Sequence, residues 1–319
     1  MTRSVLAVFS APVVDFMRRL ARAASGQGLR LYLVGGAVRD SLLGIPSTDI
    51  DFVVDGDAIA FAKYVEKNWS AVADGAPPQK VASFPRYGTA KLILGTPLFA
   101  EPDAAGIEMF DFASARSEKY PTPGGAPIVT IPGALSDDLA RRDFSINALA
   151  VEIAPDGVEH FIDQHHGERD LTARTLRVLH TQSFVDDPAR MLRAVRFMVR
   201  FSLSFDAETE RLFDEALKGR FLSRLPRPRL LDELRKTLEE GDVRPVLEKL
   251  EWYGMLKQIH PLLRLTHFER PVGTTWPERL RALCGDGSEA ELEKMLRDFE
   301  LSGRQIQDLV RRSKGAACT

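Results

Sequence analysis

Residues 31–54, LYLVGGAVRDSLLGIPSTDIDFVV, constrain the fold more than any other part of the chain. The apolar run from Leu31 to Val34 predicts a short buried strand, which a glycine pair ends. The next segment, AVRDSLLG, predicts one helical piece that stops at Gly44, and the turn IPST follows. The chain then returns to strand-forming residues with DIDFVV. The stretch therefore predicts a strand, a helix and a second strand.

Two carboxylates share one face of the second predicted strand. Side chains alternate along a strand, which places Asp49 and Asp51 on the same face and turns Ile50 and Phe52 toward the core. Adjacent carboxylates repel one another unless a cation lies between them, and Mg²⁺ takes oxygen ligands of this kind. The pair therefore predicts a Mg²⁺ site, although an Asp-x-Asp sequence alone is also common at solvated strand ends and helix caps.

The glycine pair before the helix predicts a phosphate-binding turn. Gly35 and Gly36 let the backbone approach a ligand closely, and the helix behind them offers unpaired N–H groups to a phosphate. A glycine pair alone is often only a tight turn. A phosphate cradle beside a metal-binding carboxylate pair, however, is what nucleotidyl transfer requires.

Together these residues resemble a known family. Gly-Gly-x-Val-Arg-Asp followed by Asp-x-Asp is similar to the nucleotidyltransferase signature of the class II, bacterial-type CCA-adding enzymes and poly(A) polymerases. The resemblance implies that Asp49 and Asp51 are the catalytic pair and hold Mg²⁺. It also implies that Gly36 and Arg39 bind phosphates of an incoming nucleotide.

Alternating segments after this stretch predict a small mixed α/β sheet. A helix is expected near 57–68, and strands are expected at 88–94 and 107–116. Asp111, in the second of these strands, could approach the carboxylate pair as a third acid, but a solvated position is favoured because the resembled family works with two. Arg116 matches the arginine that reaches the triphosphate in that family.

A segment rich in proline and glycine, 117–136, precedes a second motif. Its composition excludes a long element and predicts a mobile loop. After it, DDLARRDFSINALA (137–150) predicts a short helix that runs into an apolar strand, and a hairpin is expected around Asp156-Gly157. The segment resembles the second motif of the family, although a capped helix end with a salt bridge is the alternative for some of its residues. The matching residues are Arg141, Arg142, Asp143 and Asn147.

Residues 185–201, VDDPARMLRAVRFMVRF, predict one helix with an arginine-rich face. At about 100° per residue the arginines fall on one half of the helix and the apolar residues on the other, apart from Phe197. A solvated amphipathic helix would normally mix Lys and Glu on its polar face, so arginines without lysine point instead to a planar anionic ligand. The arginines are Arg190, Arg193, Arg196 and Arg200.

The same stretch resembles the nucleotide-selecting helix of the family, with Asp186 at a position where Glu is common. The resemblance implies that Asp187 and Arg190 read the base of the nucleotide. It also implies that Arg193 and Arg196 lie close to the phosphates.

The periodicity becomes helical after Asp170 and stays so, which predicts an α+β fold: an N-terminal part with a small mixed sheet, followed by an all-helical C-terminal part. The resemblance implies that these parts are a catalytic nucleotidyltransferase head at 1–170, a helical nucleotide-selecting neck at 171–240, and an abbreviated helical body that binds RNA at 241–319. Between 220 and 236, six basic residues outnumber two acidic ones. This excess fits contact with an RNA backbone, and a solvated face is the alternative.

Composition adds weaker constraints. The net charge of −2 neither favours nor excludes a nucleic-acid partner. Cys284 and Cys318 have no metal-binding spacing and suit a reducing compartment. The apolar N-terminus continues into an amphipathic helix, and no run is long enough to span a bilayer. The protein is therefore expected to be soluble and cytoplasmic, with no membrane partner; the sequence leaves its oligomeric state open.

These motifs, in this order, predict a Mg²⁺-dependent RNA nucleotidyltransferase that uses CTP and ATP and acts on the 3′ end of tRNA. A poly(A) polymerase or a partial adder of CC or A is an alternative within the same chemistry. A nucleotide-binding RNA chaperone or regulator with lapsed catalysis is an alternative from another class. A dinucleotide-binding oxidoreductase has little support because GGAVRD lacks the third glycine of that fingerprint.

Overall fold

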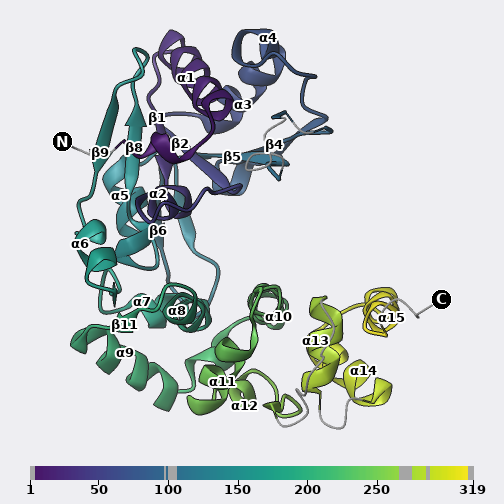
Figure 1. The fold of residues 1–319 in the computed structure, drawn as a ribbon. Coiled ribbons are helices and arrows are strands. Elements are labelled where there is room, and N and C mark those ends of the chain that lie inside the picture. Colours follow the sequence, from purple (N-terminus) through teal and green to yellow (C-terminus); the bar gives the residue numbers. More distant parts are fainter. Residues whose placement is uncertain (1–3, 97, 100–105, 266–274, 285–287, 315–319) are drawn as a thin grey trace. The chain divides into compact units, whose positions relative to one another are not determined.

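A seven-stranded sheet forms the centre of the first of two structural units (Figure 1). The computed structural model describes residues 4–96, 98–99, 106–265, 275–284 and 288–314, so Cys318 lies outside the described residues. The first unit comprises Met1–Lys119 and Pro127–Leu179, and the second comprises Tyr120–Ala126 and His180–Thr319. Over the described ranges, no helix is both long enough and apolar enough to span a membrane.

The first unit is a mixed sheet with helices. Its sheet has the order β3-β4-β5-β2-β1-β8-β9, in which β2 and β5 are parallel and the other neighbours are antiparallel. The strands are β1 (Leu31–Val34), β2 (Ile50–Val54), β3 (Lys80–Phe84), β4 (Thr89–Ile93), β5 (Met109–Ser114), β6 (Ser117–Lys119), β7 (Ile128–Thr130), β8 (Ala150–Ile153), β9 (Glu159–Ile162) and β10 (Thr175–Leu176). The helices are η1 (Leu6–Val8), α1 (Ala11–Gly26), α2 (Gly36–Leu42), α3 (Ala58–Lys67), α4 (Trp69–Val72), η2 (Pro85–Tyr87), α5 (Leu135–Ala140), η3 (Ser145–Asn147) and α6 (Gly167–Thr172).

The predicted strand–helix–strand stretch is confirmed by β1, α2 and β2. The chain turns between β1 and α2 at Gly35, whose φ of +69° favours glycine. Ile50 and Phe52 are buried, as the alternation along β2 predicted. Since β1 pairs with one edge of β2 and β5 with the other, the strand that carries Asp51 lies inside the sheet.

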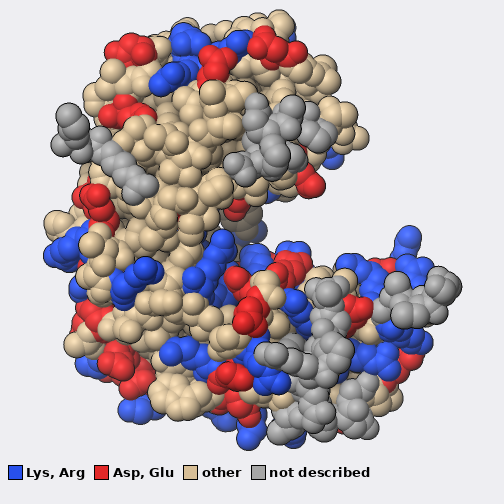
Figure 2. Space-filling model, in the orientation of Figure 1, with Lys and Arg blue, Asp and Glu red and all other residues tan. Residues whose placement is uncertain are grey.

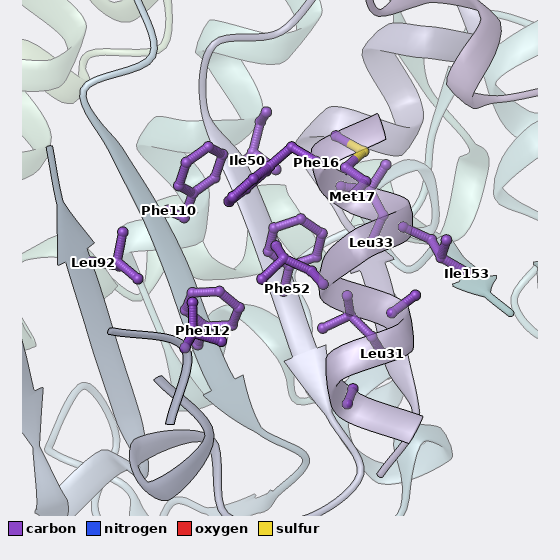
Figure 3. Close-up of a cluster of buried hydrophobic side chains, with 14 of the residues drawn as sticks. Phe16, Met17, Leu31, Leu33, Ile50, Phe52, Leu92, Phe110, Phe112 and Ile153 are labelled. Atoms are coloured by element: carbon purple, nitrogen blue, oxygen red, sulfur yellow. The ribbon is translucent and has the colours of Figure 1, made fainter. Parts of the chain in front are cut away.

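A core rich in phenylalanine covers one face of this sheet. Figure 3 shows Phe52, Phe110 and Phe112 on one side of neighbouring strands, with Phe16 of α1 among them. The ring centroids of Phe16 and Phe110 are 4.6 Å apart, and those of Phe52 and Phe112 are 5.4 Å apart. Because side chains alternate along each strand, the register that buries these rings turns the residues between them to the other face.

The second unit is helical in the described residues, apart from the two-residue strand β11. The helix α8 contacts α10 and α11 and buries Met191, Leu192 and Val195 completely. The elements are α7 (Ser183–Asp186), α8 (Ala189–Arg200), β11 (Ser204–Phe205), α9 (Ala207–Lys218), η4 (Phe221–Arg224), α10 (Arg227–Leu238), α11 (Arg244–Trp252), α12 (Met255–Ile259), α13 (Trp276–Leu283), α14 (Glu289–Asp298) and α15 (Gly303–Arg312). The predicted α+β fold, a mixed sheet followed by helices, is confirmed.

The segment at 117–136, predicted to be a mobile loop without a long element, contains two short strands that the prediction missed. The strands β6 and β7 pair in antiparallel fashion, with Ser117 opposite Thr130 and Lys119 opposite Ile128. The prolines and glycines that predicted a loop lie in the turn between these strands and after the second one, where they do not interrupt the pairing.

Candidate active site

Three carboxylates lie together on the sheet face opposite the phenylalanine core. Asp49 directly precedes β2 and Asp51 lies within it, and Asp111 of β5 is the register partner of Asp51. One carboxylate oxygen from each of the three residues lies within 4.8 Å of those of the other two. Asp111 therefore approaches the pair, as the less favoured prediction had it, because the parallel pairing of β2 and β5 brings it there.

Burial and mutual repulsion disfavour the ionised form of Asp51. Burial, with the charges of Asp49 and Asp111, raises the pKa of Asp51 to about 6, although Arg142 and Lys91 partly oppose the rise. A group of three oxygen donors that repel one another fits a hard divalent cation, which would remove the repulsion. The three carboxylates could therefore hold a metal ion.

The glycine turn before α2 lies against the side chain of Arg142. A Cβ atom at Gly35 would lie 2.5 Å from a guanidinium nitrogen of Arg142. The same guanidinium donates to the carbonyl of Asn147 at 3.3 Å. The close approach predicted for a ligand at this turn is thus used by Arg142, and a residue other than glycine would be strained at position 35.

A chain of hydrogen bonds joins α2 to the second motif. Arg39 is buried and donates to Asp40 at 2.8 Å and to the side-chain oxygen of Asn147 at 2.5 Å. Asn147 in turn donates to Asp143 at 2.9 Å, and the same carboxylate oxygen accepts the backbone N–H of Phe144. The two motifs therefore share one polar network, in which Arg39 has partners within the protein.

The paired arginines of the second motif are anchored on a buried acid that the sequence analysis missed. Asp138 is fully buried and accepts from Arg141 at 2.5 Å and from Arg142 at 2.9 Å. Burial opposes ionisation of Asp138, but the two guanidinium groups outweigh it and lower its pKa. The spacing of Asp138 from these arginines, three and four residues where a helix was predicted, was the available signal.

Arg116, the predicted triphosphate ligand, is held at the end of the sheet. Its guanidinium donates to Glu118 at 2.8 Å and to the carbonyl of Tyr87 at 2.6 Å. Glu118 also pairs with Arg141 at 3.1 Å, so the acid connects two predicted site residues. The expected roles of these residues in phosphate binding stay predictions.

In the second unit, the predicted single helix at 185–201 is broken. Asp187 has an extended conformation, with φ −136° and ψ +90°, between α7 and α8. The following Pro188 explains the break, because a proline disfavours the helical conformation of the residue before it. Asp187 therefore precedes α8, and its carboxylate accepts the backbone N–H of Ala189 at 3.1 Å.

The expectation that α8 presents a row of arginines is also wrong in part. Arg190 and Arg196 are buried. Arg190 donates to the hydroxyl of Ser183 at 2.7 Å, and Arg196 pairs with Glu233 at 3.2 Å and with Glu240 at 3.7 Å. Arg193 is half-buried, with its guanidinium 5.4 Å from the ring centroid of Phe197. The acids that pair with Arg196 lie far along the chain, so the helical plot could not reveal them.

Asp187 has a partner that no sequence pattern indicated. Arg229 of α10 donates to the second oxygen of Asp187 at 2.6 Å. Neighbouring basic residues, Arg235 and Lys236, pair with Asp232. On the face of the helical unit shown in Figure 2, Lys and Arg side chains are interspersed with Asp and Glu. The basic surface predicted for 220–236 is therefore partly neutralised.

The predicted site residues thus form two groups, one in each unit. The first unit contains the three carboxylates and the hydrogen-bond network from Arg39 to Asp143. It also contains the arginines that pair with Asp138 and Glu118. The second unit gathers Asp187 and Arg190 where α8 begins.

Two stretches of the chain match models of known protein families. Residues 31–177 match the model described as "Poly A polymerase head domain", and residues 208–265 match "Probable RNA and SrmB- binding site of polymerase A". A solved structure, "The structure of CCA-adding enzyme apo form II", is 30% identical with a TM-score of 0.75, and the alignment covers 98% of this chain and 73% of that one. The chain belongs to the family of tRNA nucleotidyltransferases and poly(A) polymerases.

Relatives within this family differ in the nucleotides that they are named for. The A-adding tRNA nucleotidyltransferase of Aquifex aeolicus is 39% identical over 231 residues, which are 72% of this chain and 26% of that protein. The CC-adding tRNA nucleotidyltransferase of Deinococcus radiodurans is 36% identical over 261 residues, which are 81% of this chain and 63% of that protein. The chain therefore spans less than two thirds of each relative. Other solved structures that it resembles are complexes with ATP, with CTP or with a tRNA.

Proposed function

We propose that this chain is a template-independent nucleotidyltransferase that adds CMP, AMP or both, from CTP and ATP, to the 3′ end of tRNA. The observation that carries the proposal is the group of three carboxylates on adjacent strands beside the glycine turn, in a chain of this family. The names of the relatives and the ligands of the similar structures support the choice of tRNA, CTP and ATP. An activity on tRNA also agrees with the expected cytoplasmic location.

Asp49 and Asp51 would hold Mg²⁺ in the proposed reaction. The bound Mg²⁺ would supply positive charge that favours ionisation of the attacking hydroxyl and stabilises the charge that develops on the phosphates. The 3′ oxygen of the RNA joins the α-phosphorus of the nucleotide, pyrophosphate leaves, and the hydroxyl proton is lost. With a pKa of about 6, Asp51 is ionised at neutral pH and can act as a ligand.

The phosphate contacts would come from groups that the protein already positions. Gly36 begins α2, and Arg39 is fixed by Asp40 and Asn147. Arg116 is fixed by Glu118. Because these arginines have partners within the protein, their guanidinium groups would need little reorganisation to meet a triphosphate. In the second motif, Arg141, Arg142, Asp143 and Asn147 would keep this arrangement rigid. Arg193 and Arg196 would contribute positive charge.

Asp187 and Arg190 would select the base. A carboxylate only accepts hydrogen bonds and a guanidinium only donates them. Cytosine and adenine present an amino group beside a ring acceptor, whereas uracil and guanine present a carbonyl beside an N–H. The wrong bases would leave buried polar groups mispaired, at a cost of about 1–3 kcal/mol each. Contacts of Asp187 with Ala189 and Arg229 would keep the selecting carboxylate in place.

Incorporation on defined tRNA ends tests the proposal. The chain is incubated with Mg²⁺, one NTP at a time, and tRNA that lacks its 3′ end or ends in C, CC or CCA. We expect incorporation of CTP, of ATP or of both on the matching ends, none of UTP or GTP, and none by Asp49→Asn or Asp51→Asn.

The products also separate the remaining functions. A long ladder of added AMP on any RNA would identify a poly(A) polymerase, which the name of the matched head domain favours as a second candidate. Nucleotide binding with no incorporation on any of the tRNA ends would contradict the proposal and identify a regulator with lapsed catalysis.

A further inference from the structure

Lys91 joins the row of acids in the first unit because of the sheet register. In the antiparallel pair of β4 and β5, Lys91 is the partner of Asp111, and in the parallel pair of β5 and β2, Asp111 is the partner of Asp51. Register partners project to the same face of a sheet. The three side chains therefore form a row across adjacent strands, with the ammonium group at one end.

The contact between Lys91 and Asp111 is direct. The Nζ of Lys91 lies 2.9 Å from Oδ2 of Asp111 and 3.6 Å from the sulfur of Met109. Of the ion pairs within the described part of the chain, this is the one that involves any of the three carboxylates. Arg142 is the other cation that acts on the charge of Asp51, but Asp138 already binds its guanidinium.

We infer that Lys91 is a positioning residue that holds Asp111 at the edge of the cation site and limits how tightly the cluster binds a divalent cation. Three carboxylates and one ammonium carry a formal charge of −2, which equals in size the charge of one divalent cation. Without the ammonium group the charge is −3, and Asp111 is free to turn toward the cation. The inference rests on the proposed function for the site, and it goes beyond that function by assigning a role in cation binding to Lys91.

Direct binding of Mn²⁺ to the full chain tests the inference without nucleotide or RNA. Electron paramagnetic resonance of free Mn²⁺ gives the dissociation constant. We expect Lys91→Met to bind Mn²⁺ about tenfold more tightly, since one positive charge is removed a few ångströms from the cation. Lys91→Arg keeps the charge and should bind as the wild type does. Lys80→Met, at an exposed position of β3, is the matched control and should have no effect.

A double variant separates the charge of Asp111 from ligation by it. Asp111→Asn alone leaves Lys91 without its partner and should weaken binding by about tenfold. The double variant Lys91→Met/Asp111→Asn restores the charge of −2 and should bind within about threefold of the wild type. If it binds as weakly as Asp111→Asn, Asp111 is itself a ligand and the assigned role of Lys91 is wrong.

Two further results distinguish a failure of the inference from a failure of the proposed function. Unchanged affinity in Lys91→Met, beside wild-type binding that Asp51→Asn abolishes, overturns the inference alone. Wild-type binding that does not depend on Asp51 overturns both. Thermal unfolding checks that each variant folds, and Lys91→Met should gain more in Tm from added Mn²⁺ than the wild type does.

Discussion

At Asp51, burial and neighbouring charge act in the same direction, and both disfavour ionisation. With its pKa raised to about 6, the folded protein binds a proton at this carboxylate that the unfolded chain releases at a lower pH. In the absence of a divalent cation, stability should therefore fall as the pH rises from about 4 to about 6. The side chain introduced in Asp51→Asn cannot ionise, so this variant should not lose stability in this pH range.

We expect Asp51→Asn to unfold a few degrees above the wild type at pH 7.5 without divalent cations, and at the same temperature as the wild type near pH 4. Added Mg²⁺ should stabilise the wild type but not the variant. Calorimetry at both pH values measures these differences, with Glu66→Gln on the exposed face of α3 as the control. If the unfolding temperature of Asp51→Asn exceeds that of the wild type by as much at pH 4 as at pH 7.5, the charge of Asp51 is not the cause of the difference.

Asp138 is the opposite case, because its ionised form is the stabilised one. Its lowered pKa means that its contribution is complete above the ordinary carboxylate range and is lost as the pH falls through its own pKa. Asp138→Asn would remove the buried counter-charge that Arg142 pairs with and one of the two acids that Arg141 pairs with. We expect a loss of about 3–5 kcal/mol in the free energy of unfolding near neutral pH.

Chemical denaturation measures the loss at Asp138, and the deficit should shrink as the pH falls below the ordinary carboxylate range, because the lowered pKa of Asp138 lies there. The exposed neighbour Asp137, which accepts the N–H of Ala134 at the start of α5, is the control. Asp137→Asn, which keeps an acceptor oxygen for this N–H, should cost less than about 1 kcal/mol. Equal losses from the two variants would mean that the buried pairs with the arginines contribute nothing beyond a helix cap.

At the scale of elements, the break between α7 and α8 sets the place of Asp187. Pro188 keeps Asp187 extended, and the carboxylate then meets both Ala189 and Arg229. In Pro188→Ala the two helices can join, which would turn the carboxylate away from these partners. We expect this variant to keep its fold and to lose discrimination of CTP and ATP against UTP and GTP by about tenfold or more.

Single-turnover incorporation with each NTP measures the discrimination. Pro228→Ala, at the first turn of α10 where a proline is tolerated, is the matched control. Full selectivity in Pro188→Ala would contradict the prediction and show that base selection does not depend on the extended conformation of Asp187.

Sequence patterns predicted the elements whose signal is local. Three such predictions are confirmed. The apolar run at Leu31–Val34 forms β1, and the alternation around Asp51 forms β2. The turn at Asp156-Gly157 joins β8 and β9 in a hairpin. The β6–β7 hairpin was missed because three-residue strands leave no periodicity to detect. The burial of Arg196 was missed, and the approach of Asp111 was considered but not favoured, because each depends on a partner from a distant segment, Glu233 in one case and β2 in the other.

The segment at 117–136, which holds the β6–β7 hairpin, leads to a prediction about the nucleotide that is added. In the resembled family, enzymes restricted to adding CC typically lack a segment of the kind found at 117–136, and here it is present in full. We therefore expect ATP to be incorporated on a tRNA that ends in CC. Incorporation of CTP on shorter ends, with none of ATP on this one, would contradict the prediction.

The chain passes between its two units three times, because Tyr120–Ala126 belongs to the second unit while the strands on either side of it belong to the first. Gly124 donates to the carbonyl of Asp186 at 3.2 Å, and a Cβ atom there would lie 2.8 Å from the carbonyl oxygen of Arg224. A protease site inserted between Leu179 and His180 therefore cuts only one of three covalent crossings. The severed pieces should still elute together in gel filtration, as halves of a split protein do, and Gly124→Val should let them come apart.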